Sequence, residues 1–159
     1  MAGWSVLHPE AGDQFPVADD KTIVLARIVD GKRVLLLSDL GRPGQEALLT
    51  RGLDLRADIL IAGLPEKPEA LCDGLLDAIE PRLIVVCDSE FPSSARAGPA
   101  LRERLVRRGI AVIYTRFAGA VTMEFEKNSW RLHTMSGLRL VELPSTAQVA
   151  RESENSFKE

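Results

Sequence analysis

The chain has few of the residues and motifs from which an enzyme class is usually inferred. Its 159 residues include two cysteines and two histidines, and aromatic residues make up 5% of the total. No serine lies in a Gly-x-Ser-x-Gly elbow, and the glycines have neither dinucleotide-binding nor P-loop spacing. The motifs taken alone therefore indicate no enzyme class.

The cysteines and histidines form no metal or redox motif. Cys72 and Cys87 lie in apolar patterns, outside any CxxC spacing, so we expect both to be small buried groups. His8 precedes a proline and is expected in a turn, whereas alternation places His133 on a sheet face. A catalytic zinc normally needs three convergent protein ligands, so two distant histidines do not predict one.

Charge and hydropathy patterning limit the range of partners. The N-terminus lacks the basic run and long apolar stretch of a signal peptide, and no segment is long enough to span a bilayer. A formal charge of -3 argues against nucleic-acid binding through bulk positive charge, although a local basic face remains open. We expect this segment to be soluble, with enough apolar content for one core.

Apolar periodicity predicts an α/β domain with a mixed β-sheet and flanking helices. Runs of β-branched and apolar residues predict strands at 4–7, 22–29, 33–38, 59–62, 83–87 and 111–115. Helical spacing predicts helices between Gly41 and Gly52, from about Pro68 to Pro81, and from about Pro99 to Arg108. Asp30 and Gly31 predict a hairpin turn early in the chain, and a terminal hairpin is expected at 119–125 and 130–134, turning at Lys127 and Asn128.

Two aspartates end predicted strands and are the best polar candidates. Asp39 follows the strand at 33–38, and Asp88 follows the strand at 83–87. Carboxylates at one sheet edge could hold a hard cation such as magnesium. Asp39 could equally accept hydrogen bonds from the backbone of the following turn, and this alternative is favoured because aspartates are common in turns.

Five arginines lie on or near the third predicted helix: Arg96, Arg102, Arg104, Arg107 and Arg108. Such a face could contact nucleic-acid phosphates, and those contacts would weaken as salt rises. However, Glu103 is interleaved, and the segment has little aromatic accompaniment for base stacking. A solvated helix face is the favoured alternative.

Residues 6–9, 19–25, 33–40 and 54–60, read in order, resemble segments in the C-terminal part of the metallo-β-lactamase-like domain of ComEC-type DNA-internalisation competence proteins. Residues 6–9 look like that family's "LHP" strand end, and 19–25 like its Asn-Asp-Asn-Ser-Leu-Val-Leu segment. Residues 33–40 are similar to its "RxLLTGDL" strand, and 54–60 match "DLxADVL". The resemblance runs to about Phe125 and implies the C-terminal half of an αββα sandwich, a hydrolase fold that uses divalent metals such as zinc or manganese.

The chain departs from that family at its ligand positions. Asp39 falls on the metal-bridging aspartate, but Leu64 and Pro65 stand where the family has His-His, and Ala95, Arg96 and Ala97 stand where it often has Gly-His-Pro. The family's upstream HxHxDH metal motif is absent from this chain. The resemblance therefore implies a fold without a complete metal site, and no cofactor is expected.

The leading hypothesis is a non-catalytic half-domain of a ComEC-like protein, residues 1–144, followed by a polar tail at 145–159. It would support DNA uptake as part of a larger protein of the bacterial inner membrane, with the remainder of that protein, another copy of the chain, or DNA as partners. One alternative is a weak metal-dependent phosphodiesterase that uses Asp39 with Asp20 or Asp88. Another alternative is a general protein-interaction module.

The missing half predicts one sheet face that is exposed and apolar, or covered by the C-terminal hairpin or by another copy of the chain. A chain whose own helices covered both faces would contradict this expectation.

Overall fold

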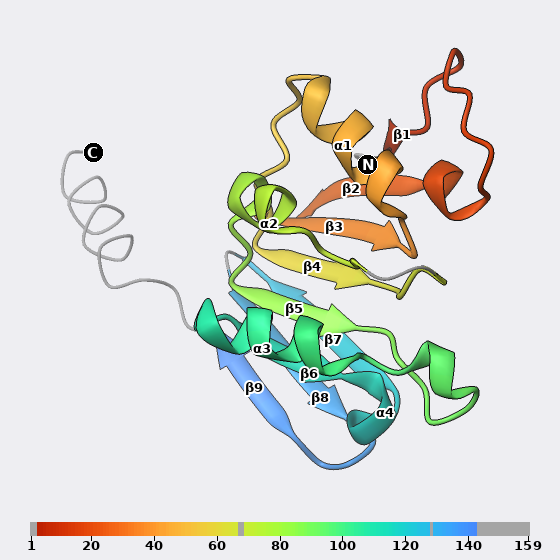
Figure 1. Ribbon diagram of the computed structural model, residues 1–159. Coiled ribbons are helices and arrows are strands. Elements are labelled where there is room, and N and C mark those ends of the chain that lie inside the picture. Colours follow the sequence, from red (N-terminus) through yellow and green to blue (C-terminus); the bar gives the residue numbers. More distant parts are fainter. Residues whose placement is uncertain (1–2, 67–68, 128, 143–159) are drawn as a thin grey trace, which may run out of the picture.

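The computed structural model describes residues 3–66, 69–127 and 129–142 (Figure 1). Its strands are β1 Ser5–His8, β2 Val24–Val29, β3 Lys32–Ser38, β4 Ile59–Ala62, β5 Leu83–Val86, β6 Ala111–Tyr114, β7 Val121–Glu126, β8 Ser129–Thr134 and β9 Arg139–Glu142. Its helices are α1 Arg42–Thr50, α2 Asp73–Ile79, α3 Pro99–Arg107 and α4 Thr115–Ala118, with short 3-10 turns η1 Asp19–Lys21 and η2 Ser93–Ala95. The tail expected at 145–159 lies outside the described residues.

The larger sheet has six strands in the order β1-β2-β3-β4-β5-β6. Strands β1, β2 and β3 pair antiparallel, and β3 to β6 pair parallel. Strands β7, β8 and β9 form a separate antiparallel sheet. The α/β class and the mixed sheet are therefore confirmed. No helix among the described residues combines the length and apolar composition that crossing a membrane requires.

A tight turn sets the register of β2 against β3. Asp30 and Gly31 have φ values of 47° and 83°, and Val29 pairs with Lys32 across them. Two consecutive positive φ values match the twist of the flanking strands, which is why Asp-Gly is favoured in two-residue hairpins. The hairpin predicted from this dipeptide is confirmed.

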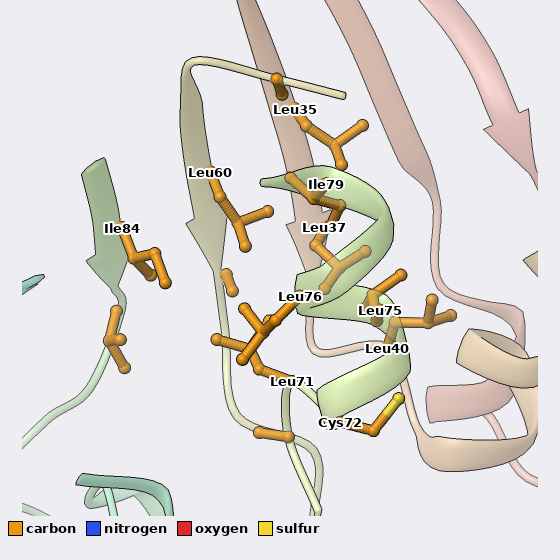
Figure 2. Packing of buried hydrophobic residues seen from close by; sticks show 14 of the residues in the cluster. Leu35, Leu37, Leu40, Leu60, Leu71, Cys72, Leu75, Leu76, Ile79 and Ile84 are labelled. Atoms are coloured by element: carbon orange, nitrogen blue, oxygen red, sulfur yellow. The ribbon is translucent and has the colours of Figure 1, made fainter. Parts of the chain in front are cut away.

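One face of the larger sheet is covered by helices. Leu35, Leu60 and Ile84, from β3, β4 and β5, point toward α2, where Leu76 and Ile79 meet them (Figure 2). Helices α1 and α3 add Leu48, Leu101 and Leu105 to the same cluster. Each right-handed crossover returns its helix to this face, because successive parallel strands here are neighbours in the sheet.

The opposite face is covered by the small sheet. Ile59, Leu83 and Ile113 of the larger sheet form a second cluster with Trp130 and Leu132 of β8. Alternation along a strand explains the two clusters, since neighbouring residues such as Ile59 and Leu60 point to opposite faces. The covering by the C-terminal hairpin is therefore confirmed, with β9 as a third strand that the sequence did not predict.

This covering stops short of the β1 edge. Trp4, Val6 and Ile23 remain exposed there. The pairing of Val6 with Leu25 places Val6 on the face opposite to the one that carries Ala26 and Leu35. The small sheet thus leaves exposed apolar side chains at the β1 end of the molecule.

Several boundaries differ from the sequence-based expectation. Helix α2 begins at Asp73, because Glu69 and Leu71 have positive φ values that a helix does not accommodate, and Pro68 lies outside the described residues. The strand expected to reach Cys87 ends at Val86, and Cys87 is exposed, so its expected burial is wrong. Thr115, expected in a strand, begins α4.

His8 also differs from its expected role in a turn. It is the last residue of β1 and is fully buried. Its Nε2 donates to the carbonyl oxygen of Asp20 at 2.7 Å, while Arg51 donates to Nδ1 at 3.0 Å. His133 is exposed on β8, as alternation predicted.

The contact between the two sheets gives a first prediction. Leu132 is 1% exposed between them, so Leu132→Ala is expected to lower the free energy of unfolding by about 2–5 kcal/mol through lost burial and a cavity. Val141→Ala, on β9 and 58% exposed, is the control and should change it by less than about 0.5 kcal/mol. Urea unfolding followed by circular dichroism measures both, and equal effects would contradict the packing of the two sheets.

Candidate nucleic-acid interface

The parallel strands β3 to β6 end at one edge of the larger sheet, and the segments that follow them gather there. In α/β sheets this carboxyl edge is where ligands usually bind. The aspartates and part of the arginines predicted as site residues lie along it.

Asp39 stands at the end of β3, after a strained residue. Ser38 has a φ of 53°, and its hydroxyl donates to Asp39 Oδ1 at 3.0 Å. The amide of Gly63 donates to the carbonyl oxygen of Ser38 at 2.6 Å. A Cβ at position 63 would lie 3.2 Å from the Asp39 amide nitrogen, so glycine allows the two strand ends to approach this closely.

The corner after β4 supplies no metal ligands. Leu64 packs against the helix-side core, and Pro65 is buried. Neither side chain has an atom that coordinates a metal. Among the residues that the structure describes, no three His, Cys, Asp or Glu side chains are grouped so that they could hold a metal ion. These residues therefore do not fit the dinuclear site of the family that the sequence resembles.

Asp88 holds three segments of the carboxyl edge together. Its side chain is fully buried, and its oxygens accept hydrogen bonds from the amides of Arg116 at 2.9 Å and Ala97 at 3.4 Å. Thr115 reinforces the contact, because its hydroxyl donates to the Asp88 carbonyl at 2.7 Å. These bonds give Asp88 a structural role in joining the end of β5 to η2 and α4.

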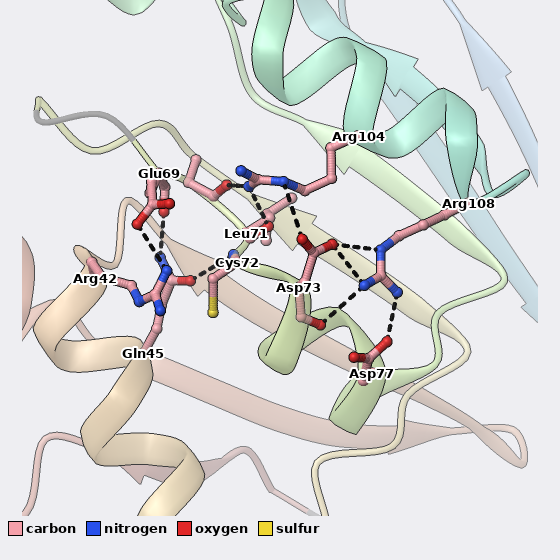
Figure 3. Close-up of polar contacts among 10 residues, drawn as sticks. Arg42, Gln45, Glu69, Leu71, Cys72, Asp73, Asp77, Arg104 and Arg108 are labelled. Carbon is pink, nitrogen blue, oxygen red and sulfur yellow. Dashed lines mark hydrogen bonds and ion pairs between the residues drawn. The ribbon is translucent and has the colours of Figure 1, made fainter.

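Two of the five arginines connect α3 and its C-cap residue to α2 and to the loop before α2. Arg104 donates to the carbonyl oxygens of Ala70 and Leu71, at 3.2 and 3.0 Å (Figure 3). Arg108 donates to Asp73 Oδ1 at 2.7 Å and to Asp77 Oδ1 at 2.7 Å. The guanidinium groups of both arginines are therefore engaged within the chain. Arg107 is exposed at the end of α3.

Gln45 of α1 holds the other side of the loop before α2, a contact that the sequence gave no reason to expect. It is fully buried, and its Nε2 donates to the carbonyl oxygen of Leu40 at 2.8 Å. The same Nε2 donates to the carbonyl oxygen of Glu69 at 3.1 Å (Figure 3). Its Oε1 accepts from the amide of Cys72 at 2.9 Å. One side-chain amide thus satisfies three backbone groups of a loop in which Glu69 and Leu71 have unusual φ values.

Arg102 of α3 contacts two aromatic rings. Its guanidinium carbon lies 5.5 Å from the ring centre of Tyr114 and 5.8 Å from that of Phe117. Arg116 of α4 lies closer to the same Phe117 ring, at 4.3 Å. Burial is the largest influence on Tyr114 and raises its pKa, although the charge of Arg102 opposes the shift. Phe117 therefore lies within cation–π range of two arginines.

Arg96 extends this group to a second exposed ring. Its guanidinium carbon lies 5.7 Å from the ring centre of Phe91. Glu90 links the two halves, because its carboxylate oxygens lie 2.7 Å from Arg96 Nη2 and 3.6 Å from Arg116 Nη1. We call this group the arginine–aromatic patch, and it consists of Phe91, Arg96, Arg102, Tyr114, Arg116 and Phe117.

The exposed rings of the patch correct the sequence-based view that the arginines have little aromatic accompaniment. Phe91 and Phe117 are 80% and 60% exposed, which is unusual for residues of their size. The patch joins the loop after β5, α3, the end of β6 and α4, so its members are scattered in sequence. Tyr114, Arg116 and Phe117 lie close together in the sequence and could have indicated part of the patch. The sequence predicted a strand and not α4 at Thr115.

The contact between α2 and α3 gives a prediction about pH. The hydrogen bond from Arg108 lowers the pKa of Asp73 below its ordinary value of 3.8. A lowered folded-state pKa stabilises the fold above the unfolded-state pKa, and this contribution is lost as pH falls through the folded-state pKa. Asp73→Asn is therefore expected to lower the melting temperature slightly at pH 7, and by less at pH 3.

Glu103→Gln is the matched control, since it removes an exposed carboxylate from the neighbouring helix α3. Thermal melts of the three proteins at several pH values measure the effect. A difference between the original chain and Asp73→Asn that stays constant from pH 7 to pH 3 would contradict the proposed linkage.

No protein-family model matches the chain, and no curated protein matches it. The contacts of the chain's own residues are therefore the basis for a functional proposal. The arginine–aromatic patch is the most informative of them, because it combines positive charge with exposed rings at the carboxyl edge of the sheet.

Proposed function

We propose that this domain is a non-catalytic module that contacts DNA through the arginine–aromatic patch. Within this proposal it is the C-terminal region of a metallo-β-lactamase-like domain in a ComEC-like competence protein. There it would support DNA uptake across a membrane as part of a larger protein. The single observation that carries the proposal is the exposed Phe117 ring between Arg102 and Arg116.

The chemistry of the patch suits nucleic acid because it offers two kinds of contact. Exposed aromatic rings can stack with bases of any sequence. Arginines beside such rings can reach the neighbouring phosphates. Arg102 is exposed and suited to this role, whereas Arg116 is mostly buried and lies against the Phe117 ring.

The charges around the patch limit how strongly it can bind. Glu90 lies between Arg96 and Arg116, and Glu103 neighbours Arg102 in sequence. The chain as a whole carries a formal charge of -3. Binding is therefore expected to be weak and to depend on the aromatic rings as well as on the charges.

A metal-dependent phosphodiesterase based on Asp39 has less support. The Asp39 carboxylate accepts a hydrogen bond from the Ser38 hydroxyl, and the Asp88 carboxylate accepts hydrogen bonds from two backbone amides. Leu64 and Pro65 provide no ligand atoms at the neighbouring strand end. The general protein-interaction module stays the second alternative, because Phe91, Phe117 and the exposed residues near β1 could also meet a protein partner.

The proposal predicts that Phe117→Ala weakens binding to single-stranded DNA. Loss of one stacked ring is worth about 1–3 kcal/mol, which corresponds to a rise in Kd of about fivefold or more. Val106→Ala removes an exposed apolar side chain from α3 outside the patch and is expected to leave the Kd unchanged. Fluorescence anisotropy with labelled single strands and duplexes at low and physiological salt measures both variants.

The arginines allow a sharper comparison within the same helix. Arg102→Ala is expected to weaken binding, whereas Arg107→Ala, exposed on α3 but outside the patch, is expected to have a smaller effect. The dependence of log Kd on log salt should fall by about 0.7 when one phosphate contact is lost. Equal effects of both variants would favour a diffuse basic face, and absence of binding at low salt would favour the protein-interaction module.

Asp39 gives a separate prediction about catalysis. No Mn²⁺-dependent cleavage of DNA is expected to depend on Asp39, because this carboxylate has no neighbouring group of metal ligands within the described part of the chain. A nuclease assay of the original chain and of Asp39→Ala, with elemental analysis of both, measures this. Cleavage that disappears in Asp39→Ala would support the phosphodiesterase alternative instead.

A further inference from the structure

A second site lies apart from the arginine–aromatic patch, between η1, the start of α1 and the corner after β4. A cavity of about 470 Å³ opens there, and it shares no residue with the patch. Its walls are mainly apolar, formed by Pro16, Val17, Pro43 and Pro65. Its acidic groups come from Asp19 and Asp20. Apolar walls with a few polar groups are typical of pockets for small ligands.

Asp20 is the unusual residue of this cavity. It is 5% exposed, and its carboxylate makes no hydrogen bond or ion pair with any residue that the structure describes, whereas Asp19 Oδ2 accepts the amide of Glu66 at 2.8 Å. The carboxylate borders the cavity, where a ligand can reach it, and apolar surroundings make a hydrogen-bond donor there favourable. The arrangement therefore points to a ligand that brings its own hydrogen-bond donor.

Gly41 is what allows Asp20 to occupy this place. A Cβ at position 41 would lie 2.2 Å from Asp20 Oδ1, so any other residue would displace the carboxylate or shift the backbone. Gly41 is the N-cap of α1, where the helix carries about half a positive charge. This partial charge only partly offsets two carboxylates, so the cavity remains negative.

The arginine in the cavity wall does not cancel the negative charge of the cavity. Arg42 lines the cavity, but its guanidinium donates to Glu46 Oε1 at 2.7 Å and to Glu69 Oε2 at 2.8 Å. Its positive charge is therefore paired with two glutamates that do not line the cavity. An anionic ligand would meet Asp19 and Asp20, and a metal ion would lack a third ligating side chain among the described residues.

We propose that this cavity binds a primary ammonium group on an unbranched aliphatic stem, with Asp20 as its charged anchor. The ammonium donates to the Asp20 carboxylate, and the stem packs against Val17 and the three prolines. Such a group could be a free aliphatic amine or the side chain of a lysine on another protein. The cavity is independent of the proposed DNA contact. The DNA-binding experiments therefore do not test the amine site, and the amine titration does not test DNA binding.

Titration of the isotope-labelled full chain with pentylamine, followed by amide chemical shifts, tests the proposal. The amides of residues 16–20 and 41–44 are expected to shift, apart from those of the prolines. Asp20→Asn is expected to raise the Kd about tenfold or more through loss of a charge-assisted hydrogen bond. Asp30→Asn is the matched control, because it removes a carboxylate from the distant β2–β3 turn, where asparagine also tolerates the positive φ.

Neutral and anionic analogues check the chemistry of recognition. Pentanol and pentanoate are expected to bind at least tenfold more weakly than pentylamine, as ligands without the cation. Equal binding of pentanol, an unchanged Kd in Asp20→Asn, or no shifts at millimolar pentylamine would each overturn the proposal. Selective broadening of the same amides by micromolar Mn²⁺ would overturn it in favour of a metal site.

A second variant keeps the test decisive if Asp20→Asn does not fold. Val17→Lys places an ammonium of the chain itself beside the cavity and is expected to abolish pentylamine binding; retained binding would contradict the proposed location. Cadaverine and acetyl-lysine amide then separate the two sources. Tighter binding of cadaverine supports a free amine as the natural ligand, and tighter binding of acetyl-lysine amide supports a lysine side chain.

Discussion

The architecture depends on the need to cover the parallel strands on both faces. All four residues of β5 are buried, and they point alternately to the helices and to the small sheet. A strand of this kind is stable only when apolar groups cover it on each side. Helices α1, α2 and α3 meet that need on one face, and β7 to β9 meet it on the other. The segments left for binding are therefore those at the strand ends.

The sequence predicted the parts of the fold in which local and global preferences agree. The apolar runs that became β4 and β5, and the Asp30–Gly31 turn, need no information from distant residues. It failed where a distant contact decides the backbone. Helix α2 begins late because Gln45 holds the preceding loop, and α4 begins where Asp88 binds the amide of Arg116.

The sequence predicted the strand ends near which the candidate site lies, but of the residues that form the site it predicted only Arg96 and Arg102. The strand ends at Asp39 and Asp88 were found from apolar runs followed by an aspartate, and both lie at the carboxyl edge. Their contacts could not be read from sequence, because the amides that bind Asp88 come from residues 97 and 116. The gathering of Phe91, Tyr114 and Phe117 around arginines likewise requires the folded chain.

The same edge of the sheet carries two surfaces of opposite charge. The arginine–aromatic patch follows β5 and β6, whereas the acidic cavity adjoins the end of β3 and the corner after β4. The close approach of Gly63 to Ser38 fixes the two strand ends beside the cavity. The fold thus separates the two surfaces by assigning them to different loops of one sheet.

The packing around Arg116 lowers the entropic cost of binding a ligand at the arginine–aromatic patch. This side chain is held by the Phe117 ring and by the carboxylates of Asp88 and Glu90. Its rotamer freedom is therefore already lost when the chain folds, before a ligand arrives. A ligand that meets the exposed side of Phe117 encounters a ring with a fixed support, so little further ordering opposes association.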